Sequence, residues 1–250
     1  MELQKLYGYV RKAIDAYGMI QEGDHIAVGV SGGKDSLTLL YALAGLRRFY
    51  PKKFALTAVS VHLGWEDMDF SPVGALCETL DVPYELVETQ IAQIVFEERK
   101  EKHPCALCAK LRKGALNDRA LAIGCNKVAY AHHRDDFVET FLLSLIKEGR
   151  LASLSPQYEL KRTGLVLIRP MMLVPEARVK GFCKKYELAV MKNACPADGN
   201  TARESVRQML TVLQRDEPEI RNRIFSALIH GEFEDWMKID TDSKSRTKIS

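Results

Sequence analysis

The 250-residue sequence has no hydrophobic run long enough to cross a membrane, and its first twelve residues mix charges without an apolar stretch. Both absences predict a cytoplasmic protein with no membrane partner. An excess of either charge is also missing, because 36 Lys and Arg residues face 33 Asp and Glu residues for a net charge of +3. Net charge therefore does not by itself indicate nucleic-acid binding.

Internal repeats are absent, and so is low-complexity sequence before the polar segment 239–250, which we expect to be a disordered tail. A chain of this length suits one large domain with small additions. We expect an N-terminal helix over 1–22, a main domain over 23–215 and a C-terminal helix over 216–238.

Strand and helix patterns alternate along the main domain. Strands are expected at 25–30, 54–63, 84–87, 127–131, 165–168 and 188–191, and helices at 36–49, 71–80, 91–100, 107–123, 135–147, 175–186, 201–213 and 217–230. This alternation predicts an α/β fold with a doubly wound parallel sheet covered on both faces. Ligands of such folds bind at the carboxyl ends of the strands.

A glycine-rich loop, Ser31–Ser36, lies between the first strand and the helix that follows it. Its adjacent glycines allow a tight turn that aims backbone N–H groups at an anion, and the helix N-terminus adds partial positive charge. Lys34 can neutralise phosphate oxygens, and Asp35 can hold Mg²⁺. The loop is not a Walker A motif, because Val28 stands where that motif has its first glycine.

The loop resembles the signature of the N-type ATP pyrophosphatases (PP-loop superfamily). That resemblance implies cleavage of ATP to AMP and pyrophosphate through an adenylated intermediate. It also implies a five-stranded parallel sheet of the adenine nucleotide alpha hydrolase type.

Two of the six cysteines, Cys105 and Cys108, stand one turn apart where a helix is expected to begin, and Cys195 follows the last expected strand. Thiolates in this position can bind a metal or a cluster. Three cysteines suit a [4Fe–4S] cluster with one open iron. Zinc with His103 as a further ligand, a redox disulfide and two ordinary thiols are the alternatives. Cys77, Cys125 and Cys183 are expected to be structural.

Polar residues also follow the expected fourth strand: His132, His133, Asp135 and Asp136. Asp136 can bind magnesium or position a substrate, whereas Asp135 can equally be a helix N-cap. Arg169, after the fifth strand, can meet a phosphate or pair with a surface acid.

Basic residues gather in two expected helices: Lys110, Arg112 and Lys113 in one, Arg203 and Arg207 in the other. They are candidates for RNA contact, and solvated helix faces are the simpler alternative.

Taken in order, these motifs resemble the tRNA 2-thiocytidine synthetase family (TtcA-like). The likeness covers residues 24–213 and rests on the run from Cys105 to Gly114, on Ala131–Asp136, on Ile168–Pro170, and on Cys195 followed by 203–210. The family implies ATP- and Mg²⁺-dependent insertion of sulfur at C2 of an anticodon-loop cytidine of tRNA. It implies a [4Fe–4S] cluster and a sulfur donor such as a cysteine desulfurase, and it is compatible with a homodimer.

Carried over residue by residue, the resemblance implies three sets. The ATP-binding set is Ser31, Gly32, Gly33, Lys34, Asp35 and Ser36, with His132, Asp135 and Asp136 as the strand-end motif beside the nucleotide. Cys105, Cys108 and Cys195 are cluster ligands. Within the first set, His132 is an ATP-binding candidate, and Lys34, Asp35 and Asp136 are the catalytic candidates. The sequence departs from the family at Lys192, where many members have a further cysteine, and over 149–158.

Three other functions share some of these features. A lysidine synthetase-like transfer to tRNA uses the same loop but does not need three cysteines. Thiolation of another base would use the whole set. A non-enzymatic nucleotide or redox sensor is disfavoured because Lys34, Asp35 and Asp136 are present together.

Overall fold

The computed structural model describes residues 1–99, 104–191 and 202–231. Its sheet has six strands in the order β3-β2-β1-β4-β6-β5. The strands are β1 (Asp24–Gly29), β2 (Phe54–His62), β3 (Tyr84–Glu88), β4 (Lys127–Ala129), β5 (Gln157–Glu159) and β6 (Val166–Ile168). All neighbours are parallel except β5, which runs antiparallel to β6 at the edge. The five predicted parallel strands are therefore confirmed.

The expected strand at 188–191 is wrong. This segment forms no strand and instead runs beside the glycine loop, where the backbone N–H of Met191 donates to the Gly32 carbonyl at 3.0 Å. The backbone of Met191 is thus hydrogen-bonded to the glycine loop rather than to a neighbouring strand. The sixth strand comes from Gln157–Glu159, which gave no strand pattern because it is short and mostly exposed.

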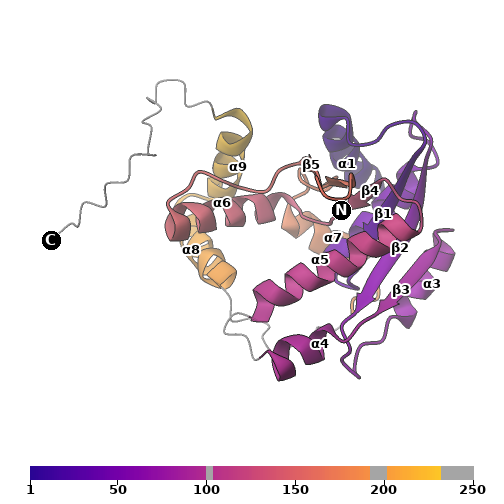
Figure 1. Ribbon diagram of the computed structural model, residues 1–250. Coiled ribbons are helices and arrows are strands. Elements are labelled where there is room, and N and C mark those ends of the chain that lie inside the picture. Colours follow the sequence, from indigo (N-terminus) through magenta and orange to yellow (C-terminus); the bar gives the residue numbers. More distant parts are fainter. Residues whose placement is uncertain (100–103, 192–201, 232–250) are drawn as a thin grey trace.

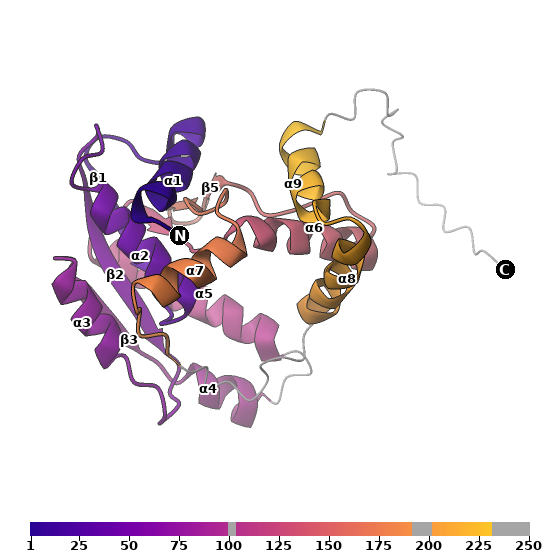
Figure 2. The same ribbon diagram turned by 180° about the vertical axis from the view of Figure 1, so that it is seen from behind.

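Helices cover both faces of the sheet (Figures 1 and 2). The helices are α1 (Leu3–Tyr17), α2 (Lys34–Leu46), α3 (Ser71–Thr79), α4 (Ile91–Gln93), a π-helical turn η1 (Ile94–Glu98), α5 (Pro104–Ala122), α6 (Arg134–Glu148), α7 (Glu176–Lys185), α8 (Ala202–Asp216) and α9 (Ile220–His230). α1, α2 and α7 lie on one face and α5 on the other. None of the described helices is long and apolar enough to span a membrane.

The two faces follow from side-chain alternation in the central strands. In β1, Ile26 and Val28 belong to the apolar cluster under α1 and α2, and Ala27 belongs to the cluster under α5. α1 adds Leu6 and Ile14 to the first cluster, both fully buried. Burying each such side chain contributes about 1.5–3 kcal/mol, so the N-terminal helix is an integral layer of the fold.

A smaller group of helices, α6, α8 and α9, extends beyond the edge of the sheet (Figure 1). α8 and α9 both pack against α6 and against each other. α8 runs through the boundary expected at 215, because Asp216 is its last residue. The expected tail at 239–250 lies outside the described residues.

Candidate active site

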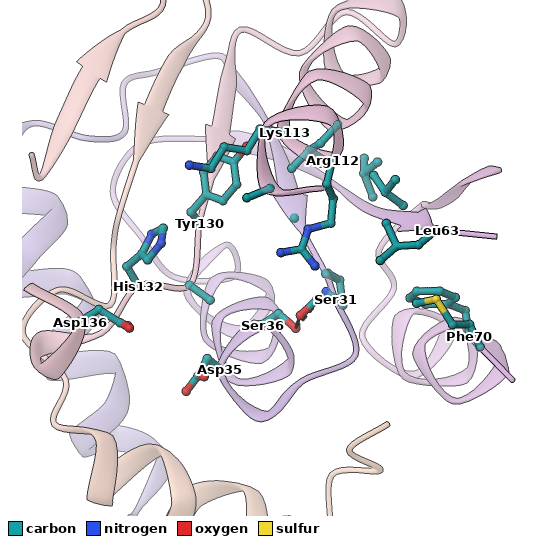
Figure 3. A pocket seen from close by; sticks show the side chains of 18 residues that line it. Ser31, Asp35, Ser36, Leu63, Phe70, Arg112, Lys113, Tyr130, His132 and Asp136 are labelled. Atoms are coloured by element: carbon teal, nitrogen blue, oxygen red, sulfur yellow. Dashed lines mark hydrogen bonds between the residues drawn. The ribbon is translucent and has the colours of Figure 1, made fainter. Parts of the chain in front are cut away.

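A cavity of about 270 Å³ opens at the carboxyl ends of β1, β2 and β4, where the sequence predicted a ligand site. Its walls differ in character (Figure 3). Leu63 and Phe70 form part of an apolar end, whereas Ser31, Asp35 and Asp136 lie on the polar side. Such a cavity can take a flat apolar ring at one end and charged groups at the other.

The glycine loop is braced by Ser36, which is buried in the first turn of α2. The Ser36 hydroxyl donates to the Gly33 carbonyl at 2.9 Å and accepts from the Ser31 backbone N–H at 3.1 Å. Gly33 is the N-cap of α2, so the positive end of this helix faces the loop. Ser36 therefore shapes the loop, while Ser31 lies at its surface.

Gly32 adopts the left-handed conformation, with φ of 75°, and packs against Met191. A Cβ atom on Gly32 would lie 2.1 Å from the Met191 sulfur and 3.0 Å from its Cβ. Both the backbone angle and the close packing thus require glycine here.

We expect Gly32→Ala to lower the free energy of unfolding by about 1–2 kcal/mol, the cost of the left-handed angle for a residue with Cβ, and more if Met191 cannot move aside. Gly33→Ala is the matched control, because Gly33 has φ of −78° and its added Cβ would meet only the Ser31 hydroxyl at 3.5 Å. Urea denaturation of both variants measures the difference. Equal stability of the two variants would contradict the role of Gly32.

Lys34, expected to contact phosphate, is not among the residues that line the cavity. Its ammonium pairs with Asp35 at 2.8 Å and with Glu176 of α7 at 3.3 Å. Burial disfavours its charge, but these carboxylates outweigh that cost and raise the pKa of Lys34. In this structure Lys34 joins the loop to α7.

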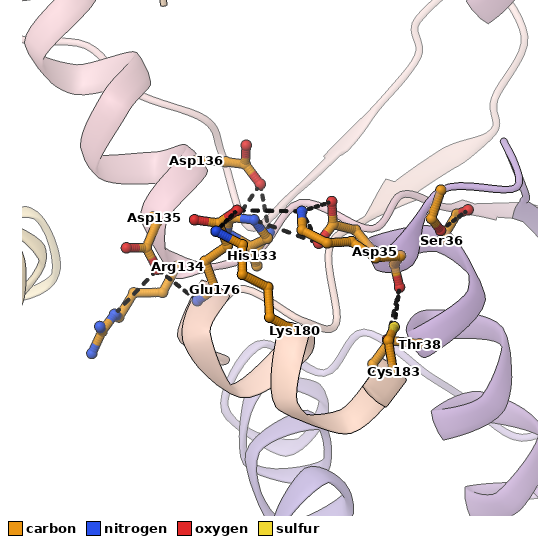
Figure 4. Close-up of polar contacts among 12 residues, drawn as sticks. Asp35, Ser36, Thr38, His133, Arg134, Asp135, Asp136, Glu176, Lys180 and Cys183 are labelled. Atoms are coloured by element: carbon orange, nitrogen blue, oxygen red, sulfur yellow. Dashed lines mark hydrogen bonds and ion pairs between the residues drawn. The ribbon is translucent and has the colours of Figure 1, made fainter. Parts of the chain in front are cut away.

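Asp35 and Asp136 approach each other through His133, which is 1 % exposed (Figure 4). One imidazole nitrogen lies 3.6 Å from Asp35 and the other 3.3 Å from Asp136. His133 is also the N-cap of α6, and its backbone N–H donates to Asp136 at 2.8 Å. Asp135 is therefore not the N-cap. It turns away from the cavity and accepts the backbone N–H of Glu176 at 2.8 Å.

His132 lines the cavity and accepts a hydrogen bond from Arg169 Nε at 3.1 Å. Burial, followed by the charge of Arg169, lowers the pKa of His132 to about 3. Arg169 is buried and also donates to the Ser155 carbonyl, and among the described residues no surface acid forms an ion pair with it. His132 thus presents a neutral ring to the cavity at physiological pH.

This low pKa predicts a pH dependence of stability. The unfolded chain protonates His132 below its ordinary pKa of 6.5, whereas the folded protein resists protonation down to about 3. The free energy of unfolding should therefore decrease as pH falls from 6.5 towards 3, by at most about 1.4 kcal/mol per pH unit from this group. For His132→Gln, the free energy of unfolding obtained from denaturation curves should decrease less steeply across this pH range. Parallel wild-type and variant profiles would contradict the low pKa of His132.

Arg112 and Lys113 of α5, which are candidates for RNA contact, line the cavity. Figure 3 shows the Arg112 guanidinium extending towards Ser31 and Ser36. Burial and then the charge of Arg169 lower the pKa of Lys113. The two side chains fit the role expected of Lys34, which is to neutralise phosphate oxygens. Lys110 is exposed on α5.

Arg203 and Arg207, also expected to contact RNA, pair with carboxylates of α6. Arg207 donates to Glu139 at 2.8 Å, and Arg203 lies 3.5 Å from Asp136 and 3.9 Å from Glu139. Arg221 of α9 adds a third cation 3.8 Å from Glu139. Glu139 is 1 % exposed, so its charge depends on these arginines, and they attach α8 and α9 to α6.

We expect Glu139→Gln to lower the free energy of unfolding by about 2 kcal/mol, below the usual cost of breaking a buried pair because the arginines are partly solvated. The control is Glu217→Gln, whose partner Arg223 lies 2.7 Å away in an exposed pair. That change should cost about 1 kcal/mol or less. Thermal denaturation compares the two variants. A Glu139→Gln protein as stable as the wild type would show that the arginines do not stabilise the packing of α8 and α9 on α6.

Cys105 and Cys108 lie in the first turn of α5, on the stripe that continues into the cavity wall at Ala109 and Arg112. Cys105 is exposed and Cys108 is half-buried. Cys195 and His103 fall outside the described residues. Cys77, Cys125 and Cys183 are buried as predicted, and burial raises the pKa of Cys77 and of Cys125 to about 11.

Several residues of the site were not predicted from the sequence. Tyr130, Met68 and Phe70 line the cavity, and Glu176 pairs with Lys34. Glu139 was missed too, although one signal was available. Asp136 and Glu139 are three residues apart on one face of α6, and Arg203 and Arg207 are four apart on one face of α8, a pattern that fits two helices paired by charge.

The chain matches the PP-loop domain family over residues 5–213. It is 34% identical to the tRNA-cytidine(32) 2-sulfurtransferase of Geobacter sulfurreducens, over 90% of this chain and 89% of that protein. It is 37% identical to the protein of the same name from Pelobacter propionicus, over 90% of this chain and 85% of the relative.

Solved structures show the same fold. The U34-tRNA thiolase NcsA from Methanococcus maripaludis, determined with its [4Fe-4S] cluster, matches with a TM-score of 0.74 at 24% identity, over 92% of this chain and 79% of NcsA. The NH3-dependent NAD synthetase of Campylobacter jejuni matches with a TM-score of 0.50 at 17% identity, over 92% of both chains.

Proposed function

Because the chain belongs to the PP-loop family and, within it, to the tRNA-cytidine(32) 2-sulfurtransferases, we propose that it is an ATP-dependent tRNA thiolase. The reaction replaces the C2 oxygen of an anticodon-loop cytidine with sulfur. ATP adenylates the oxygen, pyrophosphate departs, and AMP leaves when sulfur takes its place.

The cavity supports this chemistry through its two ends. The apolar wall formed by Val59, Leu63 and Phe70 suits the adenine ring. With adenine in that position, the phosphates can accept hydrogen bonds from the backbone N–H groups of the glycine loop and of the N-terminus of α2. Arg112 and Lys113 supply positive charge from the opposite wall, which stabilises the charge that develops on departing pyrophosphate.

Asp35 and Asp136 are the proposed Mg²⁺ ligands. Both carboxylates line the cavity, and His133 holds them in one group between the loop and α6. Oxygen ligands of this kind suit Mg²⁺, which would supply positive charge to the phosphates when bound. Lys34 and Arg203, which pair with these carboxylates, hold them in place.

A [4Fe–4S] cluster fits the cysteines of α5. Two thiols one turn apart on an accessible helix N-terminus are suitable soft ligands, and the same face leads into the cavity. Cys105 and Cys108 would hold the cluster together with Cys195. When bound, the cluster would supply the sulfur-transfer chemistry.

The partners follow from the reaction. The substrate is tRNA, and a sulfur donor such as a cysteine desulfurase must supply the sulfur. We keep Lys110 as an RNA contact, because it is exposed beside the cavity wall. A homodimer and a cytoplasmic location are further parts of the proposal.

The observation that carries the proposal is the cavity that the glycine loop and the cysteine-bearing helix share. The test is to incubate anaerobically prepared protein with ATP, a sulfide source, free lysine and unmodified tRNA, and then to digest the tRNA for nucleoside analysis by mass spectrometry. We expect 2-thiocytidine and equimolar AMP. A lysine-modified cytidine or thiouridine would point to the alternative reactions, and no modified nucleoside would contradict the proposal.

A further inference from the structure

A second cavity lies between α1 and α7, apart from the active-site cavity. Its volume is about 390 Å³, and it is lined by Met1, Lys5, Gly8, Tyr9, Lys12 and Arg178. The start of α1 contacts α7 directly, since the Leu3 backbone N–H donates to the Tyr186 hydroxyl at 3.2 Å and Glu2 pairs with Lys185. Figure 2 shows the two helices side by side, with the N-terminus beside α7. We call this cavity the α1–α7 groove.

Charge in the groove is of one sign. Lys5, Lys12 and Arg178 line it without any carboxylate, and within the described part of the chain no ion pair is formed by these three side chains. Neighbouring lysines behave differently, because Lys180 pairs with Glu176 and Lys185 pairs with Glu2. The groove thus gathers three cations on a protein whose net charge is only +3, and Glu2, which interacts with Lys5, is a nearby carboxylate.

Helix periodicity accounts for this concentration. Lys5, Gly8, Tyr9 and Lys12 recur at spacings of three and four on one face of α1, and the opposite face carries the buried Leu6 and Ile14. The groove face is therefore a continuous stripe with cations at both ends and an aromatic ring between them. Such a combination suits a nucleic-acid backbone better than a simple anion, because the ring can also contact a sugar or base.

Gly8 leaves the backbone of α1 uncovered on this face. It lies inside α1, where glycine disfavours the helix relative to alanine. Packing among the described residues does not explain it, because a Cβ on Gly8 would meet none of their atoms within 4 Å. Gly45 in α2 contrasts with it, since a Cβ there would lie 1.8 Å from the Tyr7 hydroxyl. Close approach of a ligand to the α1 backbone would account for Gly8.

The groove also lies on the helix that reaches the active site. α7 begins at Glu176, which pairs with Lys34 of the glycine loop at 3.3 Å, and Arg178 follows two residues later. With a rise of about 1.5 Å per residue, Arg178 lies about 3 Å further along the α7 axis than Glu176, so an RNA that contacts Arg178 also lies near the end of α7 that meets the glycine loop.

We propose that the α1–α7 groove binds backbone phosphates of the substrate tRNA while its target base enters the active-site cavity. This inference rests on the proposed function. Lys5, Lys12 and Arg178 neutralise the phosphates, and Tyr9 packs against the adjoining nucleotide. Gly8 lets the backbone of the RNA approach α1.

The experiment measures binding of a fluorescent, unmodified tRNA transcript to the full-length protein over a salt series. The test variant is Lys5→Gln/Lys12→Gln/Arg178→Gln. Its matched control, Lys53→Gln/Lys161→Gln/Arg162→Gln, removes the same charge from exposed residues just before β2 and β6, at the amino edge of the sheet. We expect the test variant to weaken tRNA binding about tenfold or more and to flatten the salt slope by about two to three, one per lost phosphate contact.

The control variant should change the tRNA affinity and the salt slope much less. The test and control variants should both bind ATP with wild-type affinity. Gly8→Ala provides a second readout, since it should raise the melting temperature and yet weaken tRNA binding. A test variant no weaker than the control, or a Gly8→Ala protein with wild-type affinity, would overturn the groove assignment. Failure of the wild-type protein to bind tRNA at all would instead contradict the proposed function.

Discussion

Asp35→Asn should reduce ATP-dependent AMP formation by about 10³-fold, the size of effect seen when a group that stabilises transition-state charge is removed. The Asp35 carboxylate lines the cavity at the start of α2 and is one of two proposed Mg²⁺ ligands. Asparagine keeps the shape of the side chain but removes the charge that holds the ion. Release of AMP and pyrophosphate from radiolabelled ATP measures the effect.

Two comparisons make this result specific. Asp118→Asn changes an exposed carboxylate of α5 and should leave the rate unchanged. Lys34→Gln should reduce the rate of AMP formation less than Asp35→Asn does, because Lys34 faces Asp35 and Glu176 rather than the cavity. If Asp35→Asn retains the wild-type rate, or if Lys34→Gln is the more damaging change, the assignment of Asp35 is wrong.

Replacing Cys105, Cys108 or Cys195 singly with serine should abolish both the cluster and thiolation. Anaerobically purified wild-type protein should be brown, with about four irons per chain, as a [4Fe–4S] cluster requires. The serine variants should be colourless and should lose the iron. Iron content and the visible spectrum measure the first effect, and nucleoside analysis of tRNA measures the second.

The control set is Cys77→Ala, Cys125→Ala and Cys183→Ala. These thiols are buried, so their loss should lower stability slightly but leave the iron content unchanged. Colourless wild-type protein with one zinc, lost on changing His103, would favour the zinc site. A Cys195→Ser protein with full iron and activity would contradict the ligand set.

The glycine loop and the parallel sheet could be predicted because their signals are local. Ser31–Ser36 follows a strand and precedes a helix, and this order alone places the loop at the carboxyl edge of the sheet. The buried cysteines were likewise predictable, because Cys77 and Cys183 stand inside helices and Cys125 follows a helix end.

The roles of the basic residues could not be predicted in the same way. Whether Arg112 enters a cavity or faces solvent depends on how α5 is rotated against β1 and β2, which the sequence of α5 does not reveal. Whether Arg207 meets RNA or Glu139 depends on which helix packs against α6. Similarly, the segment before Met191 carried a strand pattern, but its backbone had a nearer partner in Gly32.

The attachment of α8 and α9 to α6 has a consequence for their dynamics. Only Val206 and Leu210 of α8 and Phe225 of α9 are buried apolar residues, so charge pairs around Glu139 carry much of the contact. Added salt screens charge pairs, here through the partly solvated arginines, whereas apolar packing such as that of the sheet core has no charges to screen. Amide hydrogen exchange of α8 and α9 should therefore accelerate with ionic strength while β1 and β2 stay protected. The C-terminal helices would open as a unit of their own, and salt would set how often they do so.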